Sequence, residues 1–331
     1  GARNTDGIAG IIYLASPLPA AGLPASVVLQ LGAALLLAVV LASAAGALLA
    51  RRIARPVELI AQAAQAVSAG DLAQRVPGES EITELNSLGS AFNAMTESLR
   101  QSEQTKNAFI ADVTHELRTP LTVIKGTIET LEDGALDDLE GRGALLASMS
   151  RESERLIRLV NDLLLLTRAD AGTLRLEMQP LDLAELARSR CEHLSGLAAE
   201  HGVELRVDAI DLQASYQVQG DPDRLAQVLD NLLDNAIRYA PAGSAVNVRL
   251  ERAGSQVKCT VSDCGPGIPA QHLPYIFERF YRAQASRDRL SGGAGLGLAI
   301  AQALVQAQGG EVKALSVEGR GTEISFRLPV S

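Results

Sequence analysis

The chain has few aromatic residues, few cysteines and an acidic charge balance. Aromatic side chains make up 3% of its 331 residues, tryptophan is absent, and the formal net charge is −9. Nucleic-acid surfaces are basic and often carry aromatic side chains, so the composition argues against a nucleic-acid partner. The three cysteines, Cys191, Cys259 and Cys264, are spaced for neither a metal site nor a disulfide framework, and we expect reduced thiols.

A long N-terminal stretch contains no charged residue. No Asp, Glu, Lys, Arg or His occurs between Asp6 and Arg51, and residues 23–50 are nearly all Ala, Leu, Val and Gly. About 20 apolar residues cross a bilayer, and a single segment can do so only as a helix. A secretory signal peptide would have a shorter apolar core that follows its positive charges. Residues 23–50 are therefore predicted to form a transmembrane helix.

Positive charges follow this segment at Arg51, Arg52 and Arg55. Because such charges mark the cytoplasmic side, we expect residues 1–22 to be extracytoplasmic and the remainder to be cytoplasmic. Gly1 is no natural start, so we expect the sequence to be truncated. The length leaves room for about three small modules after the membrane.

Two helical patterns come next. Pro56 suits the first turn of a helix that runs to Ala69, and a second helix is expected from about Glu81. Its apolar residues step by three and four, as in a coiled-coil seam: Leu85, Leu88, Phe92, Met95 and Leu99. A plain coiled-coil spacer would give the same heptads. Pro56, residues 70–72, residues 81–82 and residues 92–95 nevertheless resemble a HAMP linker, which implies a parallel four-helix bundle in a dimer over residues 51–104.

His115 lies on the polar side of an amphipathic helix. The apolar stripe that we expect to be buried comprises Ile110, Val113, Leu117, Leu121, Ile124, Ile128 and Leu131. His115 points about 200° away from Val113 and Leu117, so its imidazole should be exposed. An exposed imidazole titrates near neutrality and keeps a free ring nitrogen that can attack phosphorus. The other histidines, at 193, 201 and 272, have no motif context, and we expect surface or capping roles for them.

The neighbours of His115 fit this chemistry. Glu116 can accept the proton that the ring releases, and the hydroxyl of Thr119, one turn on, could hold a water. Pro120 has no N–H for the carbonyl of Glu116, so we expect the helix to bend or loosen there. A surface histidine alone is usually an ordinary polar residue. The run from Phe109 to Leu121 resembles the phosphoacceptor box of bacterial sensor histidine kinases, which implies that His115, Glu116 and Thr119 are catalytic.

A second long helix is predicted from about Gly141 to Ala171. It carries Leu145, Leu146, Met149, Leu156, Leu159, Val160, Leu163 and Leu166, and it pairs with the first helix through a turn around residues 133–137. One hairpin would leave much of this apolar surface wet, whereas two form a four-helix bundle. We therefore expect a homodimer through residues 105–172. Residues 122–134 resemble envelope-stress kinases, and a hinge is expected near Gly172.

The helix predicted over residues 223–240 has an apolar face of Leu225, Val228, Leu229, Leu232, Leu233 and Ile237. Asn231, Asn235 and Arg238 line another side. Carboxamide oxygens at i and i+4 can meet Mg²⁺ bound to phosphate, and asparagine is otherwise unfavourable in mid-helix. Exposed polar positions with no ligand are the alternative interpretation.

Three glycine clusters follow in order. Asp263 can accept a hydrogen bond from the exocyclic amine of adenine, and Gly265 and Gly267 let the backbone approach the base. Residues 292–298 precede a helix that runs to about Ala307, and N–H groups at a helix start bind phosphate. Residues 319–322 join two final strands. With residues 276–281, the series resembles the boxes of the Bergerat-type (GHKL) ATPases, which implies ATP and Mg²⁺ as cofactors.

The resemblance implies a set of cofactor-binding residues, with Asn235 as the magnesium ligand. They are Asn231, Asn235, Arg238, Tyr239, Asp263, Gly265, Gly267, Gly293, Gly295, Leu296, Gly297 and Thr322. Gyrase and chaperone ATPases of this superfamily carry a glutamate as water-activating base where this chain has Asn231. Asparagine cannot take a proton, so an ATP-hydrolysing motor is disfavoured. A catalytically inactive membrane scaffold is the other alternative.

The expected fold class is multidomain α and α+β. Its parts are a transmembrane helix, a HAMP coiled coil, a dimeric four-helix bundle and an α/β sandwich ATP-binding domain over residues 176–331. The resemblance covers nearly the whole chain and implies a sensor histidine kinase in the bacterial inner membrane. It would phosphorylate His115, pass the phosphoryl group to an aspartate of a separate response regulator, and also dephosphorylate that regulator. We expect no fused receiver domain.

Overall fold

The computed structural model describes residues 24–77, 82–135, 138–209, 216–283 and 294–330. The chain divides into two compact units, an N-terminal unit that ends at Lys106 and a C-terminal unit that begins at Asn107. The expected extracytoplasmic segment, the first residue of the predicted membrane helix and Glu81 lie outside the described residues.

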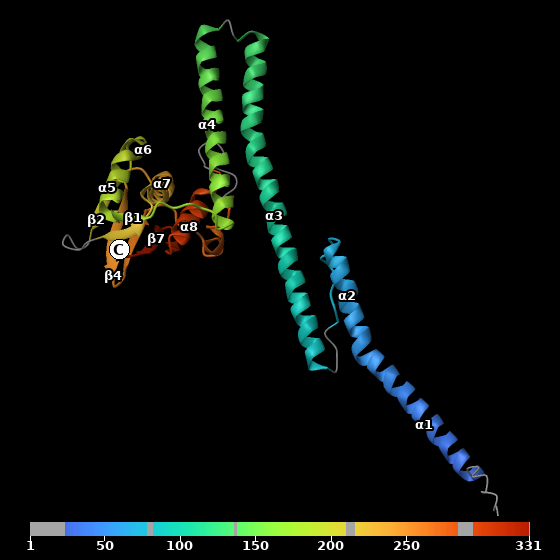
Figure 1. Cartoon of the computed structure of the whole chain (residues 1–331). Coiled ribbons are helices and arrows are strands. Elements are labelled where there is room, and N and C mark those ends of the chain that lie inside the picture. Colours follow the sequence, from blue (N-terminus) through green and yellow to red (C-terminus); the bar gives the residue numbers. More distant parts are fainter. Residues whose placement is uncertain (1–23, 78–81, 136–137, 210–215, 284–293, 331) are drawn as a thin grey trace, which may run out of the picture. The chain divides into compact units, whose positions relative to one another are not determined.

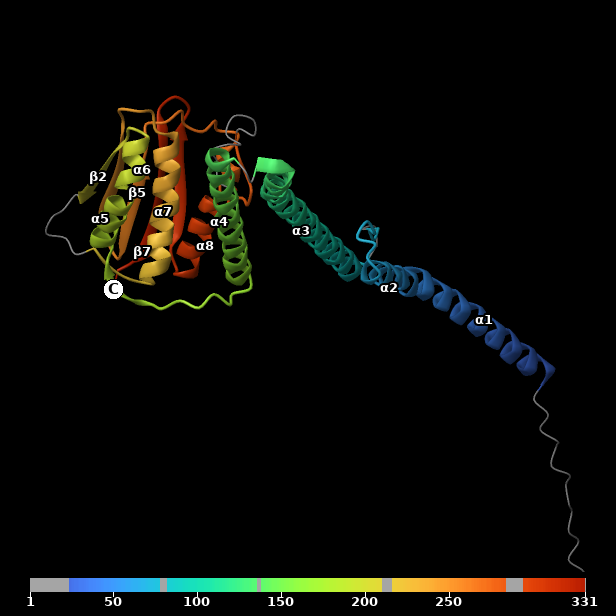
Figure 2. The same cartoon turned by 90° about the horizontal axis from the view of Figure 1, so that it is seen from above.

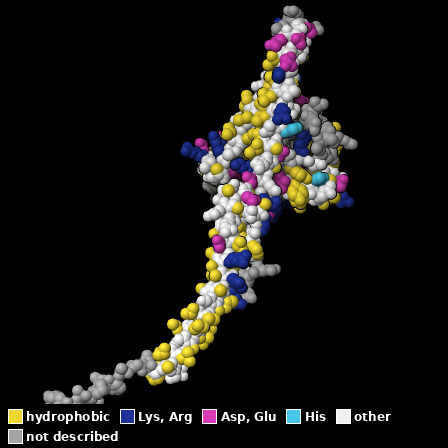
Figure 3. Space-filling model, turned by 90° about the vertical axis from the view of Figure 1, so that its right-hand side faces the viewer, with side chains coloured by type: hydrophobic (Ala, Val, Ile, Leu, Met, Phe, Trp, Pro, Cys, Tyr) yellow, Lys and Arg dark blue, Asp and Glu magenta, His cyan; other side chains and the backbone are white. Residues whose placement is uncertain are grey.

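The N-terminal unit begins with a long apolar helix. Helix α1 (Ala25–Leu49) continues through a wider π turn (Ala50–Ala54) into α2 (Arg55–Ser68) (Figure 1). The 44 residues are long and apolar enough to cross a membrane, and Figure 3 shows hydrophobic side chains over the visible face of α1. Pro56 lies in the first turn of α2, as predicted, but α2 is joined to α1 without a break. The π turn, in which the N–H of Arg55 bonds to the carbonyl of Ala50, relieves the clash between the proline ring and the preceding turn.

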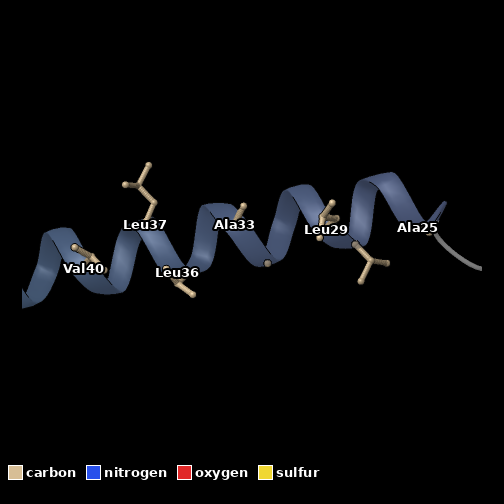
Figure 4. A pocket seen from close by; sticks show the side chains of 8 residues that line it. Ala25, Leu29, Ala33, Leu36, Leu37 and Val40 are labelled. Carbon is tan, nitrogen blue, oxygen red and sulfur yellow. The ribbon is translucent and has the colours of Figure 1, made fainter.

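A hollow runs along α1 between Ala25 and Val40 (Figure 4). All of its lining residues belong to this one helix, and every residue of α1 from Leu29 onward is exposed. The hollow is therefore an open apolar face, suited to lipid or to another helix, and not an enclosed ligand cavity.

The connector after α2 is held by a side chain of the next helix, α3 (Thr83–Thr130). The Oδ1 of Asn93 accepts a hydrogen bond from the backbone N–H of Val76, and its Nδ2 donates one to the carbonyl of Val76, both at 2.9 Å. Val76 also packs with Ala63 and Phe92 in a small buried cluster. One continuous helix, α3, contains both the coiled-coil seam and His115.

The C-terminal unit begins with a helical hairpin. After α3, a π turn (Leu131–Ala135) leads to α4 (Leu139–Asp170), and α3 continues through Pro120 without ending there. Within one chain the stripe on α3 is only partly covered. Leu131 is buried, but Ile110, Leu121 and Ile128 are 50%, 55% and 40% exposed. This partial exposure agrees with the expectation that one hairpin alone leaves much of its apolar surface wet.

The remaining chain forms a helix-covered sheet. The strands are β1 (Gln179–Asp182), β2 (Glu204–Ala209), β3 (Gln217–Gly220), β4 (Ala245–Ala253), β5 (Gln256–Ser262), β6 (Glu311–Val317) and β7 (Gly321–Pro329). The helices are α5 (Leu183–His193), α6 (Ser195–Glu200), α7 (Pro222–Tyr239) and α8 (Gly297–Ala307), with a 3-10 turn (Leu273–Tyr275). Five strands pair in the order β2-β4-β5-β7-β6, with β2 and β4 parallel and the other pairs antiparallel, while β1 and β3 form a separate ribbon.

Helices α5, α7 and α8 pack on the five-stranded sheet (Figure 2). Their inward residues and those of the strands share one buried cluster. All six apolar residues predicted to face inward on α7 are at most 1% exposed, so the helical periodicity of this segment predicted its buried face correctly.

Asp162, on α4, provides a stability prediction that depends on pH. Burial raises the pKa of its carboxyl from 3.8 to about 6, and Arg158 opposes the shift. Because the folded-state pKa is the higher one, this group carries no penalty below the unfolded value, and stability is lost as the pH rises through 6. We expect Asp162→Asn to stabilise the fold by about 1–3 kcal/mol at pH 7.5 and by little at pH 4.

The measurement is thermal unfolding of the full chain in detergent, followed by circular dichroism at both pH values. Asp112→Asn, which changes an exposed carboxyl on α3, is the matched control and should leave the melting temperature unchanged at both. Equal melting temperatures for Asp162→Asn and the parent at pH 7.5 would contradict the prediction.

Candidate functional site

His115 is exposed on α3, as its position off the apolar stripe predicted. Its side chain is 69% exposed, and its Nδ1 lies 4.0 Å from Oε1 of Glu116. Together with Arg118, Thr119, Thr122 and Val123, it lines a shallow depression of about 330 Å³. The imidazole is thus open to a reactant, and Nε2 is the ring nitrogen that faces away from the carboxylate.

Glu116 also contacts the second helix of the hairpin. Its Oε2 lies 3.5 Å from Nη2 of Arg155, and Nη1 of Arg155 lies 3.7 Å from Oε2 of Glu152. Arg155 therefore bridges two carboxylates. The sequence did not identify this arginine, because 39 residues separate it from Glu116 and nothing local marks the contact.

Thr119 is exposed one turn after His115. Its hydroxyl donates to the carbonyl of His115 at 3.4 Å, a long and weak hydrogen bond. Such a hydroxyl can exchange this partner for a water at little cost. Pro120 cannot return an N–H to the carbonyl of Glu116, so that backbone oxygen also lacks its usual helical partner.

Helix α7 carries three of the predicted nucleotide residues on successive turns: Asn231, Asn235 and Tyr239. The Nδ2 of Asn231 is buried and has no hydrogen-bond partner among the described residues. Asn235 is half-buried, and no hydrogen bond is recorded for its carboxamide within the described chain. Arg238 is engaged elsewhere, since its Nη2 lies 2.9 Å from Oδ2 of Asp234.

Asp263 lies where the first glycine loop meets the C-terminal end of α7. Its Oδ1 accepts the N–H of Gly265 at 2.8 Å, and its own N–H donates to the carbonyl of Thr322 at 3.0 Å. Burial raises the pKa of Asp263, while the backbone hydrogen bonds from Gly265 and Thr322 oppose that shift. A side chain at Gly265 would collide with the carbonyl of Tyr239 at 2.7 Å, so a glycine is required at this approach.

Two further loops close on the Asp263 segment. A Cβ at Gly267 would overlap the carbonyl of Val317, and one at Gly321 would overlap the carbonyl of Asp263. Ser316 links them, because its hydroxyl accepts the N–H of Ile268 at 2.8 Å and lies 2.9 Å from the hydroxyl of Thr322. Ser316 was missed by the sequence analysis, since a lone serine in an edge strand carries no motif.

The last glycine loop lies against α7. A Cβ at Gly297, the first residue of α8, would lie 3.3 Å from Oδ1 of Asn231. Leu296 is buried, and the carbonyl of Gly295 accepts the N–H of Phe280 at 3.0 Å. Gly293 was also predicted to bind cofactor, but it lies outside the described residues. The structure therefore brings Gly297 to Asn231, Gly265 to Tyr239, and Thr322 to Asp263.

The free polar groups fit a nucleotide with its magnesium. The unpaired Nδ2 of Asn231 is a buried donor suited to phosphate, and the carboxamide oxygen of Asn235 is a hard ligand. No three His, Cys, Asp or Glu side chains in the described chain are grouped to hold a metal. Mg²⁺ would thus take most of its oxygens from phosphate and water, as it usually does.

The chain matches three family models in sequence order. They are the HAMP domain over residues 48–101, the His Kinase A (phospho-acceptor) domain over residues 105–172, and the histidine kinase-, DNA gyrase B-, and HSP90-like ATPase over residues 220–331. A phosphoacceptor hairpin followed by an ATPase of this kind defines the class of histidine kinases.

The chain belongs to the sensor histidine kinase family. It is 36% identical over 294 residues to the signal transduction histidine-protein kinase BaeS of Escherichia coli K12. The aligned region covers 89% of this chain and 62% of BaeS. It is also similar to the solved structure of the Acinetobacter baumannii histidine kinase AdeS, with a TM-score of 0.55, 26% identity, and coverage of 66% of this chain and 98% of that one.

A second solved structure, ShkA in complex with AMPPNP, has a TM-score of 0.51 and 32% identity over 69% of this chain and 45% of that one. The chain spans less than two thirds of the length of BaeS.

Proposed function

We propose that this chain is an ATP-dependent protein histidine kinase that phosphorylates itself on His115. The observation that carries the proposal is the exposed imidazole of His115 with the carboxylate of Glu116 4.0 Å from its Nδ1. A ring nitrogen that faces solvent while its counterpart faces a base is suited to nucleophilic attack on phosphorus.

The reaction follows from this geometry. Nε2 of His115 forms a bond to the γ-phosphorus of ATP, the bond from that phosphorus to the bridging oxygen breaks, and ADP leaves. The proton on Nδ1 passes to Glu116. The phosphoryl group then moves to an aspartate of a separate response regulator, and the same surface, with Thr119, supports removal of that group by water.

The ATP site comprises the residues that α7 and the glycine loops bring together. Asp263 accepts a hydrogen bond from the adenine amine, and Gly265 and Gly267 let the backbone approach the base. Asn235 binds Mg²⁺, Asn231 donates to phosphate, and residues 295–297 offer backbone N–H groups at the start of α8. The remaining predicted contacts, from Arg238, Tyr239, Gly293 and Thr322, complete the same proposal. The ATPase family match and the AMPPNP complex of ShkA support nucleotide binding here.

Asn231 directs the γ-phosphate to histidine and not to water. An asparagine has no basic oxygen that can remove a proton from water, so hydrolysis in place is slow and ATP survives for transfer to His115. A chaperone-like or gyrase-like motor needs a base at this position.

The chain is proposed to act as a homodimer in the bacterial inner membrane. Residues 23–50 span the bilayer, residues 51–104 form the HAMP linker, residues 105–172 dimerise and carry His115, and residues 176–331 bind ATP in the cytoplasm. The exposed apolar residues of the hairpin, including Ile110 and Leu121, support pairing with a second copy.

Labelling with [γ-³²P]ATP and Mg²⁺ tests this function. The purified full chain in detergent should acquire a phosphoryl label that is labile in acid and stable in alkali, and a receiver domain should then remove it. Release of free phosphate without a labelled protein would instead identify a hydrolysing motor. Nucleotide binding with neither product would identify an inactive scaffold.

Replacement of Asn235 tests the magnesium ligand. We expect Asn235→Ala to weaken engagement of Mg²⁺-ATP by about 10- to 150-fold, because losing a bond to a charged group costs about 1.5–3 kcal/mol. The measurement is the ATP concentration that gives half-maximal labelling. Gln227→Ala, also on α7 but two turns earlier, is the matched control. Unchanged labelling of Asn235→Ala at limiting ATP would contradict its role.

A further inference from the structure

We propose that Arg155, held in place by Glu152, is a positioning residue that directs the carboxylate of Glu116 towards His115. The inference rests on the proposed function, because it concerns the proton that leaves the imidazole during phosphorylation. Oε1 of Glu116 lies 4.0 Å from Nδ1 of His115, while Oε2 of the same carboxylate lies 3.5 Å from Nη2 of Arg155. The two oxygens of Glu116 therefore have different partners.

Glu116 needs such a contact because it is the next residue after His115 on the same helix. Successive side chains of a helix diverge by about 100°, so neighbours at i and i+1 do not face each other. A glutamate side chain also has several rotamers, and a solvated one would sample all of them. Glu116 is only 25% exposed, and its contact with Arg155 comes from the other helix of the hairpin. This contact favours the rotamer that keeps Oε1 beside the imidazole.

Glu152 fixes the arginine from its own helix. Its Oε2 lies 3.7 Å from Nη1 of Arg155, at a spacing of i and i+3 on α4. That oxygen is buried and has no hydrogen-bond partner among the described residues, an arrangement that is costly unless a cation lies beside it.

The charges of the group suit this role. Two carboxylates share the single positive charge of Arg155, so a net negative charge remains beside the imidazole. The planar guanidinium reaches Glu116 and Glu152 through two different nitrogens, which a lysine ammonium could not do. Arg155 therefore orients Glu116 without neutralising the group that takes up the proton.

The first test is a mutant cycle on autophosphorylation of the full chain in detergent. Arg155→Gln should lower kcat by about 3- to 10-fold, a part of what the base itself contributes, and leave the KM for ATP within about twofold. In a Glu116→Ala background the same change should have less than about a twofold effect, because no carboxylate is left to position. Arg151→Gln, which removes an exposed arginine one turn earlier on α4, is the matched control and should match the parent.

Arg155→Gln alone leaves the buried oxygen of Glu152 without its cation, which could weaken the fold. The double variant Arg155→Gln with Glu152→Gln removes both charges, and we expect it to keep the helical circular dichroism of the parent. Its kcat should be as low as that of Arg155→Gln. A folded double variant with the kcat of the parent would overturn the proposal.

Phosphoramidate gives a second readout that needs no nucleotide. Nε2 of His115 forms a bond to its phosphorus, the phosphorus–nitrogen bond breaks and ammonia leaves, while the proton on Nδ1 passes to Glu116. The label at His115, taken as the difference from His115→Gln by intact-mass spectrometry, should form about 3- to 10-fold more slowly in Arg155→Gln.

The two phosphoryl donors separate the positioning role from the kinase function. Slower phosphoramidate labelling of Arg155→Gln, in a chain that ATP does not label, would support the role of Arg155 and refute the kinase function. Labelling of Arg155→Gln at the parent rate with both donors would overturn the role of Arg155, as would an equal loss in the Glu116→Ala background. A parent chain that neither donor labels would refute both.

Discussion

His115→Gln should abolish autophosphorylation while nucleotide binding stays at the parent level. The side chain of His115 is 69% exposed, so its removal disturbs little packing. The proposed nucleotide residues lie on α7, on β7 and on the glycine loops, none of which contributes to the depression around His115. Glutamine keeps polarity and helical propensity but offers no nucleophilic nitrogen. Acid-labile ³²P label reports the reaction, and a fluorescent ATP analogue reports binding.

The matched control is His193→Gln, which alters an exposed histidine in the last turn of α5. It should leave both the label and the binding unchanged. Loss of labelling together with loss of binding would indicate unfolding, and the helical circular dichroism signal of His115→Gln distinguishes that case. Acid-labile label that persists in a folded His115→Gln would refute His115 as the phosphoacceptor.

The parts that the sequence predicted best are those governed by local periodicity. The inward face of α7 and the exposure of His115 both depend on the angle of 100° per residue, which needs no knowledge of tertiary contacts. Gly265 and Gly267 were predicted to let the backbone approach the adenine base, which stays a prediction, and the structure shows a Cβ at either position excluded by the carbonyl of Tyr239 or Val317. The membrane-length helix follows from composition alone.

Contacts between distant segments were not predictable in this way. Arg155 reaches Glu116 across the hairpin, and Arg279 reaches Asp170 over 109 residues of sequence. Arg155 does not differ locally from an ordinary surface charge, and Arg279 belongs to residues 276–281, whose resemblance to an ATPase box implies no contact with Asp170. The continuity of α1 and α2 was missed for a different reason, since Pro56 usually marks a helix start and only the wider turn before it permits the helix to pass.

The apolar stripe of the hairpin is partly exposed in a single chain. Leu121 and Ile128 are 55% and 40% exposed, whereas Leu166, which packs towards the catalytic domain, is 1% exposed. The sequence predicts burial of the stripe in a four-helix bundle of two hairpins. A second copy of the hairpin would cover these residues. The stripe and the depression around His115 lie on the same hairpin, so dimerisation and the His115 site are parts of one proposal.

The second large effect is a division of labour between Glu116 and Thr119. Glu116→Ala should lower autophosphorylation by about 100-fold or more, because a positioned proton acceptor contributes about 10²–10⁴-fold. It should leave dephosphorylation of the regulator within a few-fold of the parent, since that reaction needs no nucleophilic histidine. Thr119→Ala should keep autophosphorylation within a few-fold of the parent and should lose dephosphorylation of the regulator. The hydroxyl of Thr119 makes a long hydrogen bond of 3.4 Å to the carbonyl of His115 and is available to orient a water.

The measurement is the decay of purified phospho-regulator in Mg²⁺ and ADP with each variant, beside the rate of autophosphorylation. Thr122→Ala is the control for Thr119→Ala, because Thr122 lines the same depression while its hydroxyl is held by the carbonyl of Arg118 at 2.9 Å. A valine at 119 would be a poorer test, since it adds bulk beside the buried Pro120. If Thr119→Ala dephosphorylates the regulator as fast as the parent, the water is held by another group. Glu116 and Thr119 would then not divide the two reactions between them.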